Sequence, residues 1–244
     1  MNARTVVFVH GALHGAWCWA AVQAELDRRG VPSEAVDLPG HGASAQSLGD
    51  TLGNAAAVTA AVEHVVARSG GPVVLVGHSY GGVVIGQAAQ RGQVDHLVFI
   101  SALVADVGES ANGVAAGLPP ADFGGTAPPR LFRRHDDGTL SADPAAAAAV
   151  FYDDCPPKVA AAAVARLCRQ RSASLEQPVT RAAWRDLPCT YVCCSRDRAI
   201  SYAAQQGLLG RLPRPAVATL PSGHSPFFAT PAAAADILAA LAWR

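Results

Sequence analysis

The sequence predicts an α/β fold built on a mostly parallel, doubly wound sheet that carries an inserted helical cap. Apolar segments of strand length alternate with helical segments, which favours a parallel sheet covered on both faces. The chain has 244 residues, half of them hydrophobic and 16% charged, enough to bury one sizeable core. The formal net charge is zero, so nothing in the composition indicates nucleic acid or an anionic membrane as a partner.

Two of the predicted strands contain runs that are apolar at every position, Val73–Val76 and Leu97–Ile100. Such runs are typical of strands that are buried on both faces of a sheet. The predicted strands are Thr5–His10, Ser33–Asp37, Pro72–Gly77, His96–Ser101, Cys189–Ser195 and Ala216–Leu220. The predicted helices are Ala16–Arg29, Leu52–Ser69, Tyr80–Arg91, Ala203–Leu212 and Pro231–Leu241.

The alternation of strands and helices stops between about residues 106 and 184. This stretch holds many of the prolines and several short helical pieces, and it has no strong strand signal. A structureless loop of this length is not expected inside a compact domain. We therefore predict a helical cap at residues 106–184, inserted into a core domain of residues 1–105 and 185–244. We expect it over the carboxyl ends of the strands, where ligands bind in open α/β sheets.

The N-terminus predicts a cytoplasmic protein, and this location bears on the expected state of the cysteines. A strand begins almost at once, without the basic region, apolar run and cleavage site of a secretion signal. No segment approaches the roughly 20 uninterrupted apolar residues of a membrane helix. The six cysteines lack the C-x-x-C spacing of zinc and redox sites, so we expect free thiols and no metal. They are Cys18, Cys155, Cys168, Cys189, Cys193 and Cys194.

The segment Gly77-His78-Ser79-Tyr80-Gly81 matches the pattern G-x-S-x-G and lies between a predicted strand and a predicted helix. The chain must turn there within very few residues, so we expect a strained backbone at Ser79. Glycine at positions 77 and 81 removes side chains that would collide in the turn. The alternative, a glycine-rich turn with an idle serine, is disfavoured by this placement. The segment resembles the nucleophile turn of the α/β-hydrolase fold, which raises the serine hydroxyl above the sheet.

A serine nucleophile needs a neutral imidazole to accept its proton. His224 directly follows the last predicted strand and is the predicted base. The carboxylate that orients it is expected after the preceding strand, where Asp197 stands. The order Ser79, Asp197, His224 is the order of the α/β-hydrolase fold. Asp106, which follows the fourth predicted strand, is the rival acid, and a surface ion pair with a neighbouring arginine is the alternative role for Asp197.

Two backbone N–H groups are the candidate oxyanion donors. One is that of Tyr80, directly after the nucleophile, and the other is that of Ala12, in the loop after the first strand. Gly11 allows this loop a close approach. His10 and His14 are four residues apart, but they lie at a strand end and a turn, not on one helix face. We therefore expect them to be structural histidines and not zinc ligands.

Four segments together resemble the plant methylesterase and hydroxynitrile lyase family and its bacterial relatives, nearly from end to end. They are His10-Gly-Ala-Leu-His-Gly-Ala-Trp17, Gly77-His-Ser-Tyr-Gly-Gly82, Ser195-Arg-Asp-Arg-Ala-Ile200 and Gly223-His-Ser225, and the cap segment Phe151-Tyr-Asp-Asp-Cys155 adds to them. The resemblance implies hydrolysis of small esters without a cofactor. The lyases carry a threonine at the position of Gly11 and a lysine at that of Ser225. Both are absent here, which favours an esterase.

We therefore expect a serine carboxylic-ester hydrolase that works through an acyl-enzyme intermediate on a small-molecule ester. A hydroxynitrile lyase, a cofactor-free oxygenase or a small-ligand receptor on the same scaffold are the alternatives, because fold does not fix function. The oligomeric state, a homodimer included, is left open. For Phe227, core packing is the alternative to a place in the pocket wall. The candidate substrate-binding residues are Leu13, Phe123, Leu131, Phe151, Tyr152 and Phe227.

Overall fold

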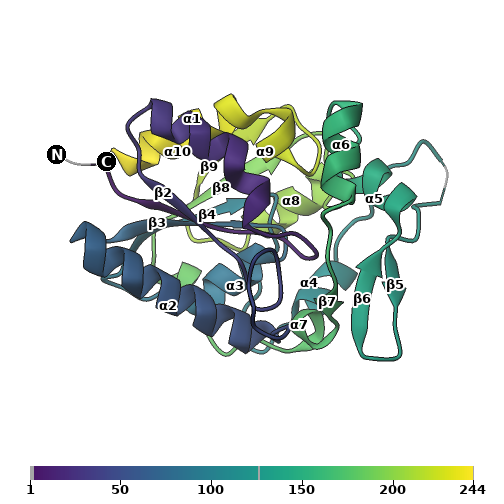
Figure 1. Ribbon diagram of the computed structural model, residues 1–244, viewed down its shortest axis with the longest axis horizontal. Helices are drawn as coiled ribbons and strands as arrows, with labels where there is room; N and C mark the ends of the chain where they lie inside the picture. Colours follow the sequence, from purple (N-terminus) through teal and green to yellow (C-terminus); the bar gives the residue numbers. More distant parts are fainter. Residues whose placement is uncertain (1–2, 126, 244) are drawn as a thin grey trace.

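A six-stranded parallel sheet forms the centre of the computed structural model, which describes residues 3–125 and 127–243 (Figure 1). The strand order is β2-β1-β3-β4-β8-β9, and every neighbouring pair is parallel. The strands are β1 (Val6–Val9), β2 (Ser33–Val36), β3 (Val73–His78), β4 (Val94–Ile100), β8 (Cys189–Cys194) and β9 (Ala216–Leu220).

Helices cover both faces of this sheet. Successive side chains of a strand point to opposite faces, so Leu75 and Phe99 pack with α2 and α3, whereas Phe8 and Val76 pack with α1 and α10. Figure 1 shows α1 and α10 on one side of the sheet and α2 and α3 on the other. The helices of this core are η1 (Ala16–Trp19), α1 (Ala20–Arg28), α2 (Thr51–Ser69), α3 (Gly81–Ala88), α8 (Tyr202–Leu209), α9 (Pro226–Ala229) and α10 (Pro231–Ala242).

This architecture confirms the predicted fold class. All six predicted strands and all five predicted helices are present, with ends that differ by three residues or fewer. The first predicted helix begins with the 3-10 turn η1, and the short helix α9 was not predicted. No helix within the two described ranges is long and apolar enough to cross a membrane.

The segment between β4 and β8 contains a small antiparallel sheet as well as helices. The sequence shows no strong strand signal in this segment, and these strands were not predicted. Strands β5 and β6 form a hairpin whose turn contains Gly138 at φ +76°, and β7 pairs with β6 from much later in the chain. These strands have three, four and two residues, too few for a visible alternation. The elements are α4 (Ala111–Ala116), β5 (Phe132–Arg134), β6 (Thr139–Ala142), α5 (Pro144–Phe151), α6 (Pro157–Val164), β7 (Gln170–Arg171), α7 (Ala173–Glu176) and η2 (Ala183–Arg185).

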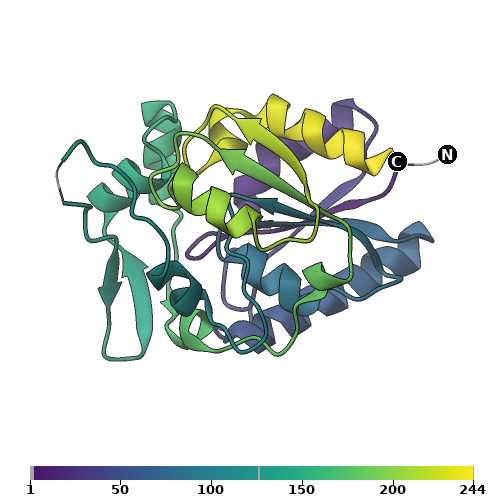
Figure 2. The ribbon, with the colours of Figure 1, turned by 180° about the vertical axis from the view of Figure 1, so that it is seen from behind.

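Helices α5 and α6 and the hairpin β5–β6 lie together at one end of the central sheet, as both views show (Figures 1 and 2). Loops that follow β1, β3, β4, β8 and β9 meet this segment around one pocket. The division of the chain into a core and a cap at residues 106–184 stays a prediction.

Candidate active site

Ser79 occupies the turn between β3 and α3 with a left-handed backbone, φ +53°. This conformation is unfavourable for a residue with a side chain and persists only where the surrounding structure enforces it. The flanking glycines make the turn possible. A Cβ atom on Gly77 would lie 2.5 Å from the carbonyl oxygen of Gly81, and one on Gly81 would lie 2.7 Å from that of Val9. The expected strain and its cause are thus both present.

Asp197 and His224 form a buried pair. The Nδ1 atom of His224 lies 2.7 Å from Oδ2 of Asp197. The other carboxylate oxygen, Oδ1, accepts the backbone N–H groups of Ala199 and Ile200 at 2.6 and 2.9 Å. The hydroxyl of Ser101 donates to Oδ2. Each oxygen therefore has a separate role, since Oδ1 fixes the loop and Oδ2 faces the imidazole.

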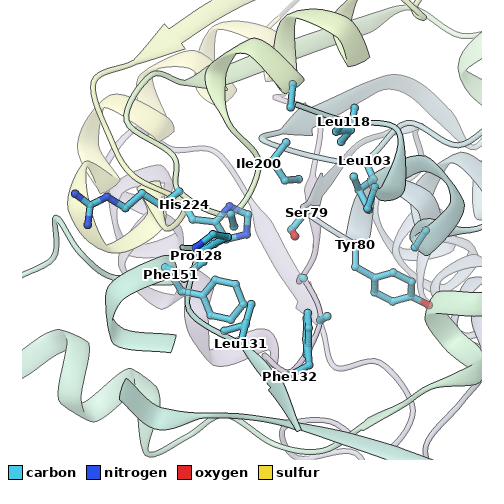
Figure 3. Close-up of a pocket in the computed structure, with 18 of the residues that line it drawn as sticks. Ser79, Tyr80, Leu103, Leu118, Pro128, Leu131, Phe132, Phe151, Ile200 and His224 are labelled. Atoms are coloured by element: carbon cyan, nitrogen blue, oxygen red, sulfur yellow. The ribbon is translucent and has the colours of Figure 1, made fainter. Parts of the chain in front are cut away.

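The imidazole of His224 and the hydroxyl of Ser79 line the same pocket and face one another across it (Figure 3). Because Nδ1 is occupied by Asp197, Nε2 is the ring nitrogen left for the serine. Two side chains hold the histidine in place. The Nε2–H group of His78 donates to the backbone carbonyl of His224 at 2.7 Å, and the ring of Phe151 stacks on the imidazole with centroids 5.3 Å apart.

The rival carboxylate, Asp106, lies elsewhere. It pairs with Arg185 at 2.5 Å, and this ion pair lowers the pKa of the Asp106 carboxyl. The alternative role for Asp197, a surface ion pair with an adjacent arginine, does not match the geometry either. Arg196 and Arg198 pair instead with two acidic residues of the inserted segment, Asp154 and Asp153.

The loop after β1 lies against Ser79. A Cβ atom on Gly11 would lie 3.0 Å from Cβ of Ser79, so glycine permits this approach. Ala12 and Tyr80, whose N–H groups are the candidate oxyanion donors, both line the pocket beside Ser79. Leu13 has a left-handed backbone, φ +68°. This conformation is costly for a leucine, so a second strained residue lies close to Ser79.

The two histidines of this loop use their ring nitrogens within the protein. Nδ1 of His10 lies 2.8 Å from the Gly11 carbonyl oxygen, and its Nε2 accepts the Leu38 N–H at 3.1 Å. Nδ1 of His14 lies 2.8 Å from the Ala12 carbonyl oxygen. These contacts match the expected structural role. Over residues 3–125 and 127–243, no group of three or more His, Cys, Asp or Glu side chains is placed to hold a metal ion.

His14 also connects the loop to the inserted segment, because the hydroxyl of Tyr152 donates to its Nε2 at 2.7 Å. This bond requires the neutral tautomer with hydrogen on Nδ1. Burial lowers the pKa of His14 to about 4, although its bond to the Ala12 carbonyl acts in the opposite direction. Burial also lowers the pKa values of His10 and His78 well below the usual range.

These histidines predict a loss of stability in mild acid. In the unfolded chain His14 has its ordinary pKa of about 6.5 and binds a proton that the folded protein rejects until about pH 4. The free energy of unfolding therefore falls as the pH falls through this window, by about 2 kcal/mol between pH 7 and pH 5 for His14 alone. Urea unfolding at both pH values measures the difference, and His14→Gln should reduce it by that amount. An equal difference in both proteins would contradict this assignment.

The pocket has a volume of about 390 Å³ and a largely apolar wall. Three of the candidate substrate-binding residues belong to this wall, namely Phe123, Leu131 and Phe151. The other three are buried and lie outside the residues that line it, namely Leu13, Tyr152 and Phe227. Phe227 packs on Trp19 and His78, which matches the alternative of core packing.

Several residues of the site were not identified from the sequence. Ser101, which donates a hydrogen bond to the carboxylate of Asp197, directly follows β4. Its position at the end of a predicted strand could have indicated that it belongs to the site. Leu103 and Ile200 follow strand ends in the same way. The remaining wall residues labelled in Figure 3 come from loops of the inserted segment and from the start of the short strand β5, where no periodic pattern marks them, and are Leu118, Pro128 and Phe132.

Comparison with known proteins places this geometry in context. A model of the Alpha/beta hydrolase family matches residues 6–237. A probable hydrolase, R7, of a Phoma species is 26% identical over 99% of this chain and 99% of its own. Methylesterase 7 of Arabidopsis thaliana is 34% identical over 43% of this chain and 42% of its own. A solved structure of a pyrethroid hydrolase from Sphingobium faniae JZ-2 superposes with a TM-score of 0.81 at 27% identity, over 98% of this chain and 97% of that one. These similarities confirm the resemblance to the methylesterases that the motifs indicate.

Proposed function

Since the chain belongs to the alpha/beta hydrolase family and is a hydrolytic enzyme of the carboxylesterase type, we propose that it cleaves small apolar esters with Ser79 as nucleophile. The observation that carries this proposal is the buried bond between His224 Nδ1 and Asp197 Oδ2, at 2.7 Å, in a site where the imidazole and Ser79 share one pocket. A serine, a histidine and a buried carboxylate in this arrangement support acyl transfer.

In the first step, Nε2 of His224 takes the proton of the Ser79 hydroxyl as the oxygen attacks the ester carbonyl. The carbonyl oxygen becomes negative, and the N–H groups of Ala12 and Tyr80 stabilise it by hydrogen bonds. The tetrahedral intermediate collapses, the carbon–oxygen bond to the alcohol breaks, and the alcohol leaves with the proton from His224. The acyl group stays on Ser79 as an ester.

In the second step, His224 takes a proton from water, which attacks the acyl-enzyme in the same way. Collapse of the second intermediate releases the acid and returns the proton to Ser79. Asp197 keeps its charge throughout. It holds hydrogen on Nδ1, so that Nε2 can accept a proton, and it stabilises the imidazolium that forms in both steps.

The pocket wall supports an apolar substrate. Leu118, Leu131 and Phe132 come from the inserted segment, and Leu103 and Ile200 come from loops of the sheet. Among the described wall residues, Arg198 is the only Asp, Glu, Lys or Arg, and it is paired with Asp153. A charged acyl or alcohol group would lose its hydration in this pocket without gaining a free partner.

Hydrolysis of p-nitrophenyl acetate, butyrate and octanoate tests the proposal. We expect turnover of the neutral esters, with kcat/KM rising from acetate to butyrate as apolar surface is buried, by about tenfold for roughly two CH₂ groups. The control is p-nitrophenyl hydrogen adipate, whose terminal carboxylate is too far from the ester to displace p-nitrophenol through a five- or six-membered ring. Once the rate without enzyme is subtracted, it should react far more slowly than p-nitrophenyl hexanoate, the neutral ester of equal acyl length. Absence of turnover with every neutral ester by folded protein would contradict the proposed function.

A further inference from the structure

Gln170 lies in β7 of the inserted segment, and its buried side chain reaches the loop that carries one candidate oxyanion donor. Its Oε1 atom accepts the backbone N–H of Leu13 at 3.0 Å. The same oxygen lies 2.9 Å from Nε2 of His41, and the Nε2 group of Gln170 donates to the hydroxyl of Ser174 at 2.5 Å. The orientation of the amide is fixed, because a backbone N–H can only donate and must face the oxygen.

Leu13, whose backbone N–H binds Gln170, has a strained backbone. Leu13 has φ +68° and directly follows Ala12. Its carbonyl oxygen accepts the backbone N–H of Cys168 at 2.9 Å, so residues 168 and 170 occupy both of its backbone polar groups. A left-handed leucine costs about 1–2 kcal/mol and needs external contacts to persist. The inserted segment supplies those contacts.

The same network reaches the second candidate donor. The phenol of Tyr80 accepts a hydrogen bond from Asn54 Nδ2 at 2.9 Å, and it lies within hydrogen-bonding reach of Thr51 and Ser174. Thr51 donates to the Ser174 carbonyl oxygen at 2.6 Å. Gln170, Ser174, Thr51 and Asn54 are all fully buried. Hydrogen-bonded groups of a buried polar network hold one another in place, although Oδ1 of Asn54 has no hydrogen-bond partner among the described residues. These side chains lie between the strained backbone of Leu13 and the side chain of Tyr80, which directly follows Ser79.

We propose that Gln170 is a positioning residue for ester hydrolysis, which fixes the Ala12 N–H for the oxyanion by holding the strained backbone of Leu13. This inference rests on the proposed function. Gln170 touches no reacting atom and acts through the loop. Loss of Gln170 should therefore destabilise the transition state, in which the oxyanion is charged, more than it weakens the binding of the ester.

The variant Gln170→Met tests this role, because methionine has a similar length and its thioether is only a weak acceptor for the Leu13 N–H. We expect kcat for p-nitrophenyl butyrate to fall about 10- to 100-fold with KM nearly unchanged, since a small misplacement of a catalytic group can cost that much. An alkyl trifluoromethyl ketone, which forms a tetrahedral adduct with serine, should bind more weakly by the same factor. A methyl ketone of equal chain length, which only fills the pocket, should bind equally well to both proteins.

Two further variants separate positioning from general stability. Gln170→Glu keeps an acceptor at the position that faces the Leu13 N–H and Nε2 of His41. We expect this variant to recover much of kcat. The matched control is Gln87→Met, because Oε1 of Gln87 also receives two N–H groups, in this case the backbone N–H groups of Thr180 and Arg181, and Gln87 lies outside the pocket wall. It should lower stability and leave kcat unchanged.

Folded Gln170→Met with wild-type kcat and wild-type affinity for the trifluoromethyl ketone would overturn this inference. Equal weakening of both ketones would also overturn it, because that result indicates a collapsed pocket. If Gln170→Met does not fold, Gln170→Asn serves in its place. The asparagine side chain is one methylene group shorter, so its amide oxygen lies farther from the Leu13 N–H. The same loss of kcat is therefore expected. Turnover that persists in Ser79→Ala would instead overturn the proposed function itself.

Discussion

Ser79→Ala is expected to lower kcat for p-nitrophenyl butyrate by about 10⁴- to 10⁶-fold, with little change in the affinity for a methyl ketone that fills the pocket. The reason is chemical and local. The hydroxyl is the only group at the turn that can form the acyl-enzyme, and alanine leaves the pocket wall intact. Residual turnover should be independent of His224, because the imidazole then has no hydroxyl to deprotonate.

The control for this substitution is Ser69→Ala, which removes an exposed hydroxyl at the end of α2. Its kcat should equal that of the wild type. Thermal unfolding should also show that Ser79→Ala folds, and the smaller residue should suit the left-handed backbone no worse than serine. Turnover within about tenfold of the wild type would contradict the role of Ser79, because loss of a nucleophile costs far more than that.

Asp197→Asn is expected to lower kcat about 10⁴-fold although it preserves the shape of the site. Oδ1 of Asp197 accepts the N–H groups of Ala199 and Ile200, so the amide oxygen of asparagine must stay there. The amide nitrogen then faces Nδ1 of His224 and donates to it. The imidazole is left with hydrogen on Nε2, toward Ser79, and cannot accept the serine proton.

Ser101→Ala is the graded control for that prediction. It removes one hydrogen bond to Oδ2 of Asp197 and leaves the carboxylate and the tautomer of His224 unchanged. We expect a much smaller fall in kcat, about tenfold or less, in line with the loss of one hydrogen bond worth about 1 kcal/mol. If Asp197→Asn and Ser101→Ala lowered kcat equally, the tautomer would not be the cause.

The core of the fold and the three central residues could be predicted from the sequence because local signals determine them. A Cβ atom at position 77 or 81 would lie less than 3 Å from backbone atoms of the turn or of β1. Both positions therefore require glycine, and both belong to the G-x-S-x-G motif. Strand β1 and the runs Val73–Val76 and Leu97–Ile100 are apolar at every position. The carboxyl ends of β3, β8 and β9 place residues 79, 197 and 224 at one edge of the sheet. Order along the chain and position after a strand were sufficient to bring these residues together.

The inserted segment could not be predicted in the same way. Strand β5 is exposed at all three positions, so burial imposes no alternating pattern on it, and β7 has only two residues. The pocket wall depends on how α4, the proline-containing loops and β5 meet the sheet, which no local signal encodes. No local sequence signal marks Gln170 either, because its proposed role depends on a contact with Leu13, which is 157 positions away in the chain.

The central claim is that Ser79 forms a covalent intermediate, and active-site labelling tests it most directly. Diethyl p-nitrophenyl phosphate transfers its phosphoryl group to an activated serine and releases p-nitrophenol. Peptide mass mapping should locate the adduct on Ser79, with p-nitrophenol released in an amount equal to the enzyme, and Ser79→Ala and Asp197→Asn should react far more slowly. An adduct on another residue, or equal labelling of Ser79→Ala, would contradict the account.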